Sequence, residues 1–142
     1  MNIGFYLENT ANEKQMSEIC NAITRAFSDK IIKDAAIFFD DATPCNVKVP
    51  CATFNSCDLW SFHGKLVTCS YNTLIKAMQI VNNIDIYYYY EVGKINTISL
   101  LLLEDIETVC NGDYAKSNFK RLTNSDPLGV SINYNNIIEV IS

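Results

Sequence analysis

Apolar residues in this chain form short runs and helical stripes that alternate along most of its length. The clearest example lies in residues 64–92. Its first part, Lys65–Cys69, is a short apolar run of the kind found in strands that are covered on both faces. Apolar residues recur at helical spacing over Tyr71–Asn82 and predict a helix there. The β-branched and aromatic residues of Asp85–Tyr90 predict a second strand, so the segment reads as one parallel βαβ unit.

The remaining segments continue this alternation. Further strands are predicted at Asn2–Glu8, Asp34–Phe39, Cys51–Phe54, Ile106–Cys110 and Leu128–Ile132. Helices are predicted at Glu13–Ser28, after Asp113 to about Leu122, and at the end of the chain, where Asn133 is the expected cap. Ile95–Glu104 fits either a strand or a helix by composition, and the alternation favours a helix. This order predicts an α/β fold. We expect a single three-layer αβα, Rossmann-like domain over residues 1–142, with a mainly parallel sheet.

Composition narrows the class of protein. The chain has 142 residues, of which 49% are hydrophobic and 19% charged, which suits one folded domain and argues against disorder. Its net charge of −5 argues against nucleic-acid binding and against an anionic membrane surface. The longest aliphatic run, Leu100–Leu103, is too short to cross a bilayer, and the first residues do not resemble a signal peptide. We therefore expect a soluble intracellular protein.

Motifs for metals and nucleotide cofactors are missing. The chain has six cysteines, and the even spacing of Cys45, Cys51 and Cys57 matches no usual zinc pattern. Buried cysteines in a reducing compartment are the simpler interpretation. No G-x-G-x-x-G follows the first predicted strand, and no G-x-x-x-x-G-K-[ST] occurs. The sequence therefore predicts neither a metal site nor a bound cofactor.

Polar residues follow the predicted strands, at the edge where open α/β sheets bind ligands. The candidate ligand-binding residues are Asn9, Thr10, Asp40, Asp41, Asn55, Thr68, Ser70 and Tyr90. Glu8, Glu91 and Asn111 lie at the same strand ends. These residues could form a small-molecule site, or they could be ordinary turn and cap residues, because turns and helix caps are polar in any such fold. Asp40 and Asp41 could hold a cation, serve as a base or be solvated. Tyr90 could stack on a sugar or a base, or pack in the core.

A cluster of large apolar residues, most of them aromatic, lies at and after the end of the short third predicted strand. It comprises Phe54, Leu59, Trp60 and Phe62, and it either closes the edge of the sheet or forms an exposed contact patch. One short turn buries four such side chains poorly, so we expect a homodimer in which two identical patches meet. His63, the only histidine, lacks a paired nucleophile and is more typical of a structural residue than of a catalytic one.

The chain resembles small glycosyltransferase-like proteins of T4-like phages that infect marine bacteria, including cyanophages. The resemblance covers nearly the whole chain and rests on the opening NIGFYLEN, on FNSCDLWSFHGKLVTCSYNTLIKAMQIVNN followed by IDIYYYYEV, on IETVCNGDYAKSNFKRL, and on the ending PLGVSINYNNIIEVI. Its most specific part is D-L-W-x-F-x-G followed by a strand with T-x-S. The resemblance implies the amino-terminal, Rossmann-like half of a two-domain glycosyltransferase of the GT-B type, which mainly receives the acceptor.

This sequence departs from that family in two respects. Family members often carry an insertion after the aromatic strand, where this chain has only Glu91–Lys94, and the half that usually grips the nucleotide sugar is absent. The resemblance implies a phage-encoded glycosyltransferase-like protein that binds or acts on a sugar or nucleotide sugar and is incomplete as an enzyme alone. The alternative is a non-enzymatic module that binds a phage or host protein. Both place it in the host cytoplasm, and the second also in the virion.

Overall fold

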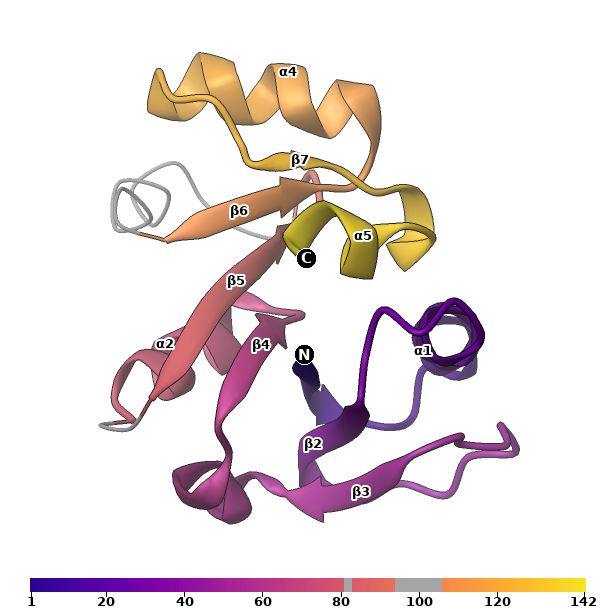
Figure 1. Cartoon of the computed structure of the whole chain (residues 1–142). Helices are drawn as coiled ribbons and strands as arrows, with labels where there is room; N and C mark the ends of the chain where they lie inside the picture. The colour runs from indigo at the N-terminus through magenta and orange to yellow at the C-terminus, as the bar shows by residue number, and fades with distance from the viewer. Residues whose placement is uncertain (81–82, 94–105) are drawn as a thin grey trace.

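The computed structural model describes residues 1–80, 83–93 and 106–142 (Figure 1). Seven strands form one parallel sheet in the order β3-β2-β1-β4-β5-β6-β7. The strands are β1 (Asn2–Asn9), β2 (Asp34–Asp41), β3 (Ala52–Asn55), β4 (Gly64–Thr68), β5 (Ile84–Tyr90), β6 (Glu107–Cys110) and β7 (Gly129–Val130). The helices are α1 (Glu13–Ser28), α2 (Tyr71–Met78), α4 (Gly112–Thr123) and α5 (Ile137–Ile141), with 3-10 turns η1 (Ser56–Ser61) and η3 (Ile132–Tyr134). The predicted Rossmann-like α/β fold is confirmed.

The order in which successive strands are added across the sheet reverses between β1 and β4. From β1 the strands step outward to β2 and to β3 at the edge, and the chain then returns through η1 to β4 on the other side of β1. From β4 they step outward in the opposite direction to β7. The neighbours β1 and β4 pair in parallel, with Phe5 opposite Val67 and Tyr6 opposite Thr68. Their carboxyl ends therefore form the switch point at which such sheets bind ligands.

Helices cover both faces of the sheet. On one face, apolar side chains of β1 and β2 pack with α1 and α5, around residues such as Phe5, Ile23 and Ile137. On the other face, α2, η1 and α4 cover two clusters. Tyr87 and Tyr89 belong to the first face and Tyr88 and Tyr90 to the second, as strand alternation predicts.

The helix that follows β4 is shorter than predicted. The helix expected over Tyr71–Asn82 ends at Met78, because bonds from the amide of Gln79 to Lys76 and from Ile80 to Ala77 tighten its last turn. The helix expected over Ile95–Glu104 lies outside the described residues.

The end of the chain differs from the prediction. The strand expected over Leu128–Ile132 is only Gly129–Val130, and η3 follows it. Asn133 does not cap the last helix: it has φ 50°, and the helix begins at Ile137, after Asn136. The reason is tertiary, because the Asn133 amide donates to Asn111 Oδ1, which follows β6.

Candidate functional site: a polar cavity at the carboxyl edge

A cavity of about 640 Å³ opens where β1 and β4 end. We call it the carboxyl-edge cavity. It is lined by Leu7, Glu8, Asn9, Asn12, Lys14, Gln15, Glu18, Cys69, Ser70, Tyr71, Asn72, Glu91, Asn111, Asn133 and Tyr134. Its size is that of a small-molecule site, and its position is the switch point of the sheet.

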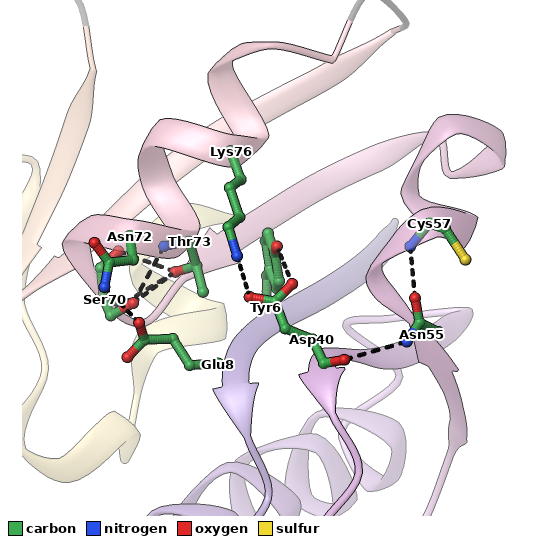
Figure 2. Close-up of polar contacts among 9 residues, drawn as sticks. All are labelled: Tyr6, Glu8, Asp40, Asn55, Cys57, Ser70, Asn72, Thr73 and Lys76. Carbon is green, nitrogen blue, oxygen red and sulfur yellow. Dashed lines mark hydrogen bonds and ion pairs between the residues drawn. The ribbon is translucent and has the colours of Figure 1, made fainter.

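Helix starts fix two sides of this cavity. Asn12 caps α1, and its Oδ1 accepts from the amide of Gln15 at 3.1 Å. Ser70 caps α2 through a reciprocal capping box with Thr73 (Figure 2). On the third side, Asn111 and Asn133 are joined by the bond described above. Three segments far apart in the sequence thus present polar side chains to one space.

Several carboxamides of the cavity have NH₂ groups that make no hydrogen bond to other described residues. Asn9 uses its Oδ1 to accept from the amide of Ala11, Asn12 uses its own as the α1 cap, and Asn111 accepts from Asn133. In each case the oxygen is engaged, and within the described residues the NH₂ group has no hydrogen-bond partner. Each bond fixes the orientation of its amide, so the cavity presents preset donors to a ligand.

The charge of the lining is negative. Glu8, Glu18 and Glu91 are the acidic residues, and Lys14 is the one cation among the lining residues that the structure describes. Glu8 accepts from Asn72 Nδ2 at 2.6 Å (Figure 2), which ties the end of β1 to the first turn of α2. A pyrophosphate would meet net repulsion here, whereas hydroxyl groups would find both donors and acceptors.

Tyr134 is a rigid wall of the cavity. Its side chain is 1% exposed and its ring stacks on Tyr89 at 4.0 Å, while its hydroxyl accepts from Gln15 Nε2 at 3.0 Å. Burial raises the pKa of Tyr134, so the phenol stays neutral. Its backbone has φ 61°, a left-handed conformation that is costly for an aromatic residue. Such strain concentrates at functional sites and persists only where the surroundings enforce it.

Cys69 lies in the lining but is a poor nucleophile. Burial raises the pKa of its thiol to about 12, because desolvation disfavours the thiolate. A protonated thiol neither attacks an electrophile nor ligates a metal well. Among the described residues, no group of three or more His, Cys, Asp or Glu side chains could hold a metal ion. The polar groups of the described lining are carboxamides, carboxylates, an ammonium group and hydroxyls, which can all form hydrogen bonds.

The structure places only part of the predicted site in this cavity. Asn9 and Ser70 line it, together with Glu8, Glu91 and Asn111 from the same strand ends. Six other lining residues were not predicted from the sequence to belong to the site: Asn12, Gln15, Tyr71, Asn72, Asn133 and Tyr134. The asparagine before α1 was a detectable signal, since a cap at the start of that helix must lie at the carboxyl edge.

Three predicted residues are buried or serve as anchors. Thr68 is fully buried and donates to the carbonyl of Tyr87 at 2.9 Å. Tyr90 is 1% exposed, and its hydroxyl accepts from Asn118 Nδ2 at 2.6 Å. Thr10 is buried against Thr43, whose carbonyl and amide it bonds. These side chains hold the sheet and a loop in place and do not line the cavity.

Asp40 belongs to a separate network beside α2 (Figure 2). It accepts from the Tyr6 hydroxyl at 2.6 Å and pairs with Lys76 Nζ at 2.7 Å, and Asn55 Nδ2 donates to its carbonyl at 3.2 Å. Burial pushes the pKa of Asp40 upward, but hydrogen bonds from Lys76, Tyr6 and Ser56 outweigh it and hold the pKa below its usual value. Asp41, its neighbour, is exposed. The two acids therefore differ in environment: Asp40 is held in this network, whereas Asp41 is exposed.

The four predicted interface residues differ in how far they are exposed. Leu59 is buried at 1% exposure, and Phe62 is half-buried, with its ring 5.3 Å from that of Phe38. Phe54 and Trp60 are 41% and 58% exposed. An exposed patch made of all four side chains is therefore not present.

Comparison with known proteins adds no identification. No family model, curated protein or solved structure matches the chain. Among the described residues, no helix is long and apolar enough to span a membrane.

Proposed function

We propose that this chain binds a saccharide in the carboxyl-edge cavity, as a glycosyltransferase-like protein that is incomplete as an enzyme alone. The observation that carries the proposal is the set of preset carboxamide donors on Asn9, Asn12 and Asn111 at the switch point of the sheet. Sugar hydroxyls are both donors and acceptors, and a lining of carboxamides and carboxylates offers partners for each role.

The charge of the cavity favours a neutral saccharide over a nucleotide sugar. Three carboxylates and one ammonium group line it, and the chain has no phosphate-binding loop. A diphosphate would lose its hydration without gaining a matching set of cations. This supports the acceptor role that the sequence resemblance implies, with the donor held by another polypeptide.

Each group has a role in this proposal. The carboxamides of Asn9, Asn12 and Asn111 donate to hydroxyl oxygens, and Glu18 accepts from hydroxyl protons. Tyr71, half-buried at the start of α2, offers a ring face to the apolar side of a sugar. Ser70 and Thr73 keep that helix start in position.

Ligand titration with matched variants tests the proposal. Thermal shift and saturation-transfer NMR would be recorded with neutral mono- and oligosaccharides and with nucleotide sugars. A saccharide in large excess over its Kd should stabilise the fold by roughly 1–3 kcal/mol. Asn12→Ser keeps the helix cap but removes the NH₂ donor, so it should weaken binding about tenfold, the value of one lost hydrogen bond.

The control variant is Asn21→Ala, which changes an exposed asparagine of α1 that does not line the cavity. It should bind as the wild type does. Lys14→Gln separates the ligand classes, because it should reduce the binding of a nucleotide sugar and leave that of a neutral saccharide unchanged. If no saccharide binds at millimolar concentration, the proposed function is wrong.

A second candidate, an interaction module that associates with a second copy of itself, is favoured by the exposure of Phe54 and Trp60. Large exposed aromatic side chains are typical of protein contacts. Light scattering at micromolar concentration should then give twice 16.0 kDa, and Trp60→Ser should give the monomer mass. A wild-type monomer at these concentrations would remove this candidate.

A further inference from the structure

A second cavity lies at the opposite, amino edge of the sheet and plays no part in the proposed function. It has a volume of about 490 Å³ and lies between η1 and the amino ends of β1, β2 and β3. We call it the amino-edge hollow. Its apolar lining residues are Ile3, Ala35, Ala36, Phe38, Ala52, Phe54 and Phe62.

The topology explains why this hollow exists. The connection from β3 to β4 must cross β2 and β1, and in this chain the six-residue η1 is the only helix of that crossover (Figure 1). A longer helix would cover the outer strands on this face. Here Phe54 of β3 remains 41% exposed beside Phe38. The face of the sheet is thus left with an apolar recess.

The recess is shaped by aromatic rings. Phe38 stacks against Phe54 with centroids 5.7 Å apart and an interplanar angle of 28°. Phe62 meets Phe38 edge-on, with centroids 5.3 Å apart and an interplanar angle of 67°. Ring faces carry negative electrostatic potential, so such a wall attracts a cation as well as an apolar body.

The charged side chains of the lining are negative, like the electrostatic potential at the ring faces. Asp34 and Asp58 are its charged residues, and no lysine or arginine lines the hollow. Asp34 Oδ1 accepts from the amide of Ala35 at 2.9 Å, and its Oδ2 has no partner among the described residues. Asp58 likewise has no hydrogen bond or ion pair within the described residues. His63 and Ser61 complete the rim.

We propose that the amino-edge hollow binds a small organic cation: an amine with an aromatic or branched apolar body. The body would occupy the recess between Phe54 and Phe62, and the ammonium group would lie between the ring faces and the carboxylates of Asp34 and Asp58. A pocket with apolar walls and a few convergent polar groups is the usual form of a small-molecule site. The two carboxylates and the ring faces select the positive charge.

Three probes of one shape test this assignment: phenethylamine, neutral 2-phenylethanol and anionic 3-phenylpropionate. Amide NMR titration should show the amine shifting signals of Ala36, Ala52 and Ser61. The alcohol should bind about fivefold to tenfold more weakly, and the anion should not bind measurably. Affinity for the amine should fall with added salt, because both carboxylates are exposed.

Variants assign the effect to the hollow. Asp34→Asn and Asp58→Asn should each reduce amine binding about threefold to fivefold, whereas Asp113→Asn, an exposed acid at the start of α4, should not. Ala52→Phe fills the recess with a residue that suits a strand, and should abolish binding while the chain stays folded. Saccharide binding at the carboxyl edge should be unaffected by Ala52→Phe, so the two proposals fail separately.

Two results would overturn the assignment. One is equal binding of the amine and the anion, or no binding of the amine at millimolar concentration. The other is a dimer in light scattering that Ala52→Phe dissociates, since this would mean that a second copy fills the hollow.

Discussion

The two ends of the sheet are built by different means. At the carboxyl end, the carboxyl-edge cavity is bordered by side chains that cap helices and turns, such as Asn12 and Ser70, and their hydrogen bonds fix its shape. At the amino end, the amino-edge hollow is bordered by rings that pack on each other, and it exists because a short connection leaves Phe54 partly uncovered. One end is shaped by satisfied polar groups, and the other by an incomplete apolar layer.

This difference has a physical consequence. Caps and carboxamides at the carboxyl end contribute little apolar burial, so changing them should alter binding more than stability. Rings at the amino end contribute dispersion and burial, so changing them should alter stability as well. Stability measurements on single variants can therefore test the comparison directly.

The largest effect is expected at Tyr134, a buried aromatic residue of the polar end. Tyr134→Ala should lower the free energy of unfolding by about 3–5 kcal/mol, because it removes a ring that is 1% exposed and stacked on Tyr89. Tyr71→Ala, at a half-buried lining position, should cost much less. Urea denaturation measures both. Equal costs would mean that Tyr134 is not the rigid wall that its contacts indicate.

Gly64 should rank next, and comparison with a second glycine, Gly4, tests the packing of the amino end. Gly64 has φ 143°, and a Cβ there would lie 2.6 Å from the backbone carbonyl oxygen of Asn2, so Gly64→Ala should cost roughly 2–3 kcal/mol. At Gly4, a Cβ would meet side-chain atoms of Leu66, Phe62 and Phe38 at 3.0, 3.1 and 3.2 Å. The two rings border the hollow, which gives them room to shift, whereas Leu66 is fully buried.

Gly4→Ala should therefore cost less than Gly64→Ala, about 1 kcal/mol of unfolding free energy. Thermal or urea unfolding of the two variants side by side gives the ranking. A loss at Gly4 as large as that at Gly64 would show that Leu66, Phe38 and Phe62 cannot move, and that the amino end is packed as tightly as the rest of the core.

The fold was predictable from sequence because its signals are local. Runs such as Lys65–Cys69 and the helical stripe that follows it need no knowledge of distant residues, and the structure confirms a parallel sheet with helices on both faces. The end of the chain was not predictable in the same way. The conformation of Asn133 depends on its bond to Asn111, twenty-two residues earlier.

The candidate site was predictable only in part, for a related reason. Strand ends locate the edge of the sheet, and Asn9 and Ser70 follow from them. They do not tell which side chains face the cavity: Thr68 and Tyr90 turn into the core instead. Residues that α1 and η3 bring to the edge, such as Gln15 and Tyr134, require the packing of helices on the sheet.

A moderate effect is expected at Asp40, which tests whether polar groups near the carboxyl end stabilise the fold when they do not line the cavity. Asp40→Asn should lower the free energy of unfolding by about 1–2 kcal/mol at pH 7, because the 19% exposed carboxylate loses charge-assisted bonds from Lys76 and Tyr6. Saccharide binding should be unchanged.

The pH dependence of this effect has a defined sign. The pKa of Asp40 is lower in the folded protein than in the unfolded chain, so its contribution is present above the unfolded pKa. It is lost as the pH falls through the folded pKa, so the difference between wild type and Asp40→Asn should shrink below about pH 4. Denaturation at several pH values measures this, and a difference that grows on acidification would contradict the network.

The smallest stability effect is expected at Asn12, where the comparison is sharpest. Serine caps helices about as well as asparagine, so Asn12→Ser should change the free energy of unfolding by only a few tenths of a kcal/mol, whereas Asn12→Ala should cost about 1 kcal/mol. Both variants remove the carboxamide NH₂ that we propose as a donor to the saccharide, so both should weaken saccharide binding to a similar extent. If binding instead follows stability, falling in Asn12→Ala and not in Asn12→Ser, then Asn12 acts on the cavity only by holding α1. In that case Asn12 would shape the polar end only as a helix cap, and the donors of Asn9 and Asn111 would have to account for any binding that remains.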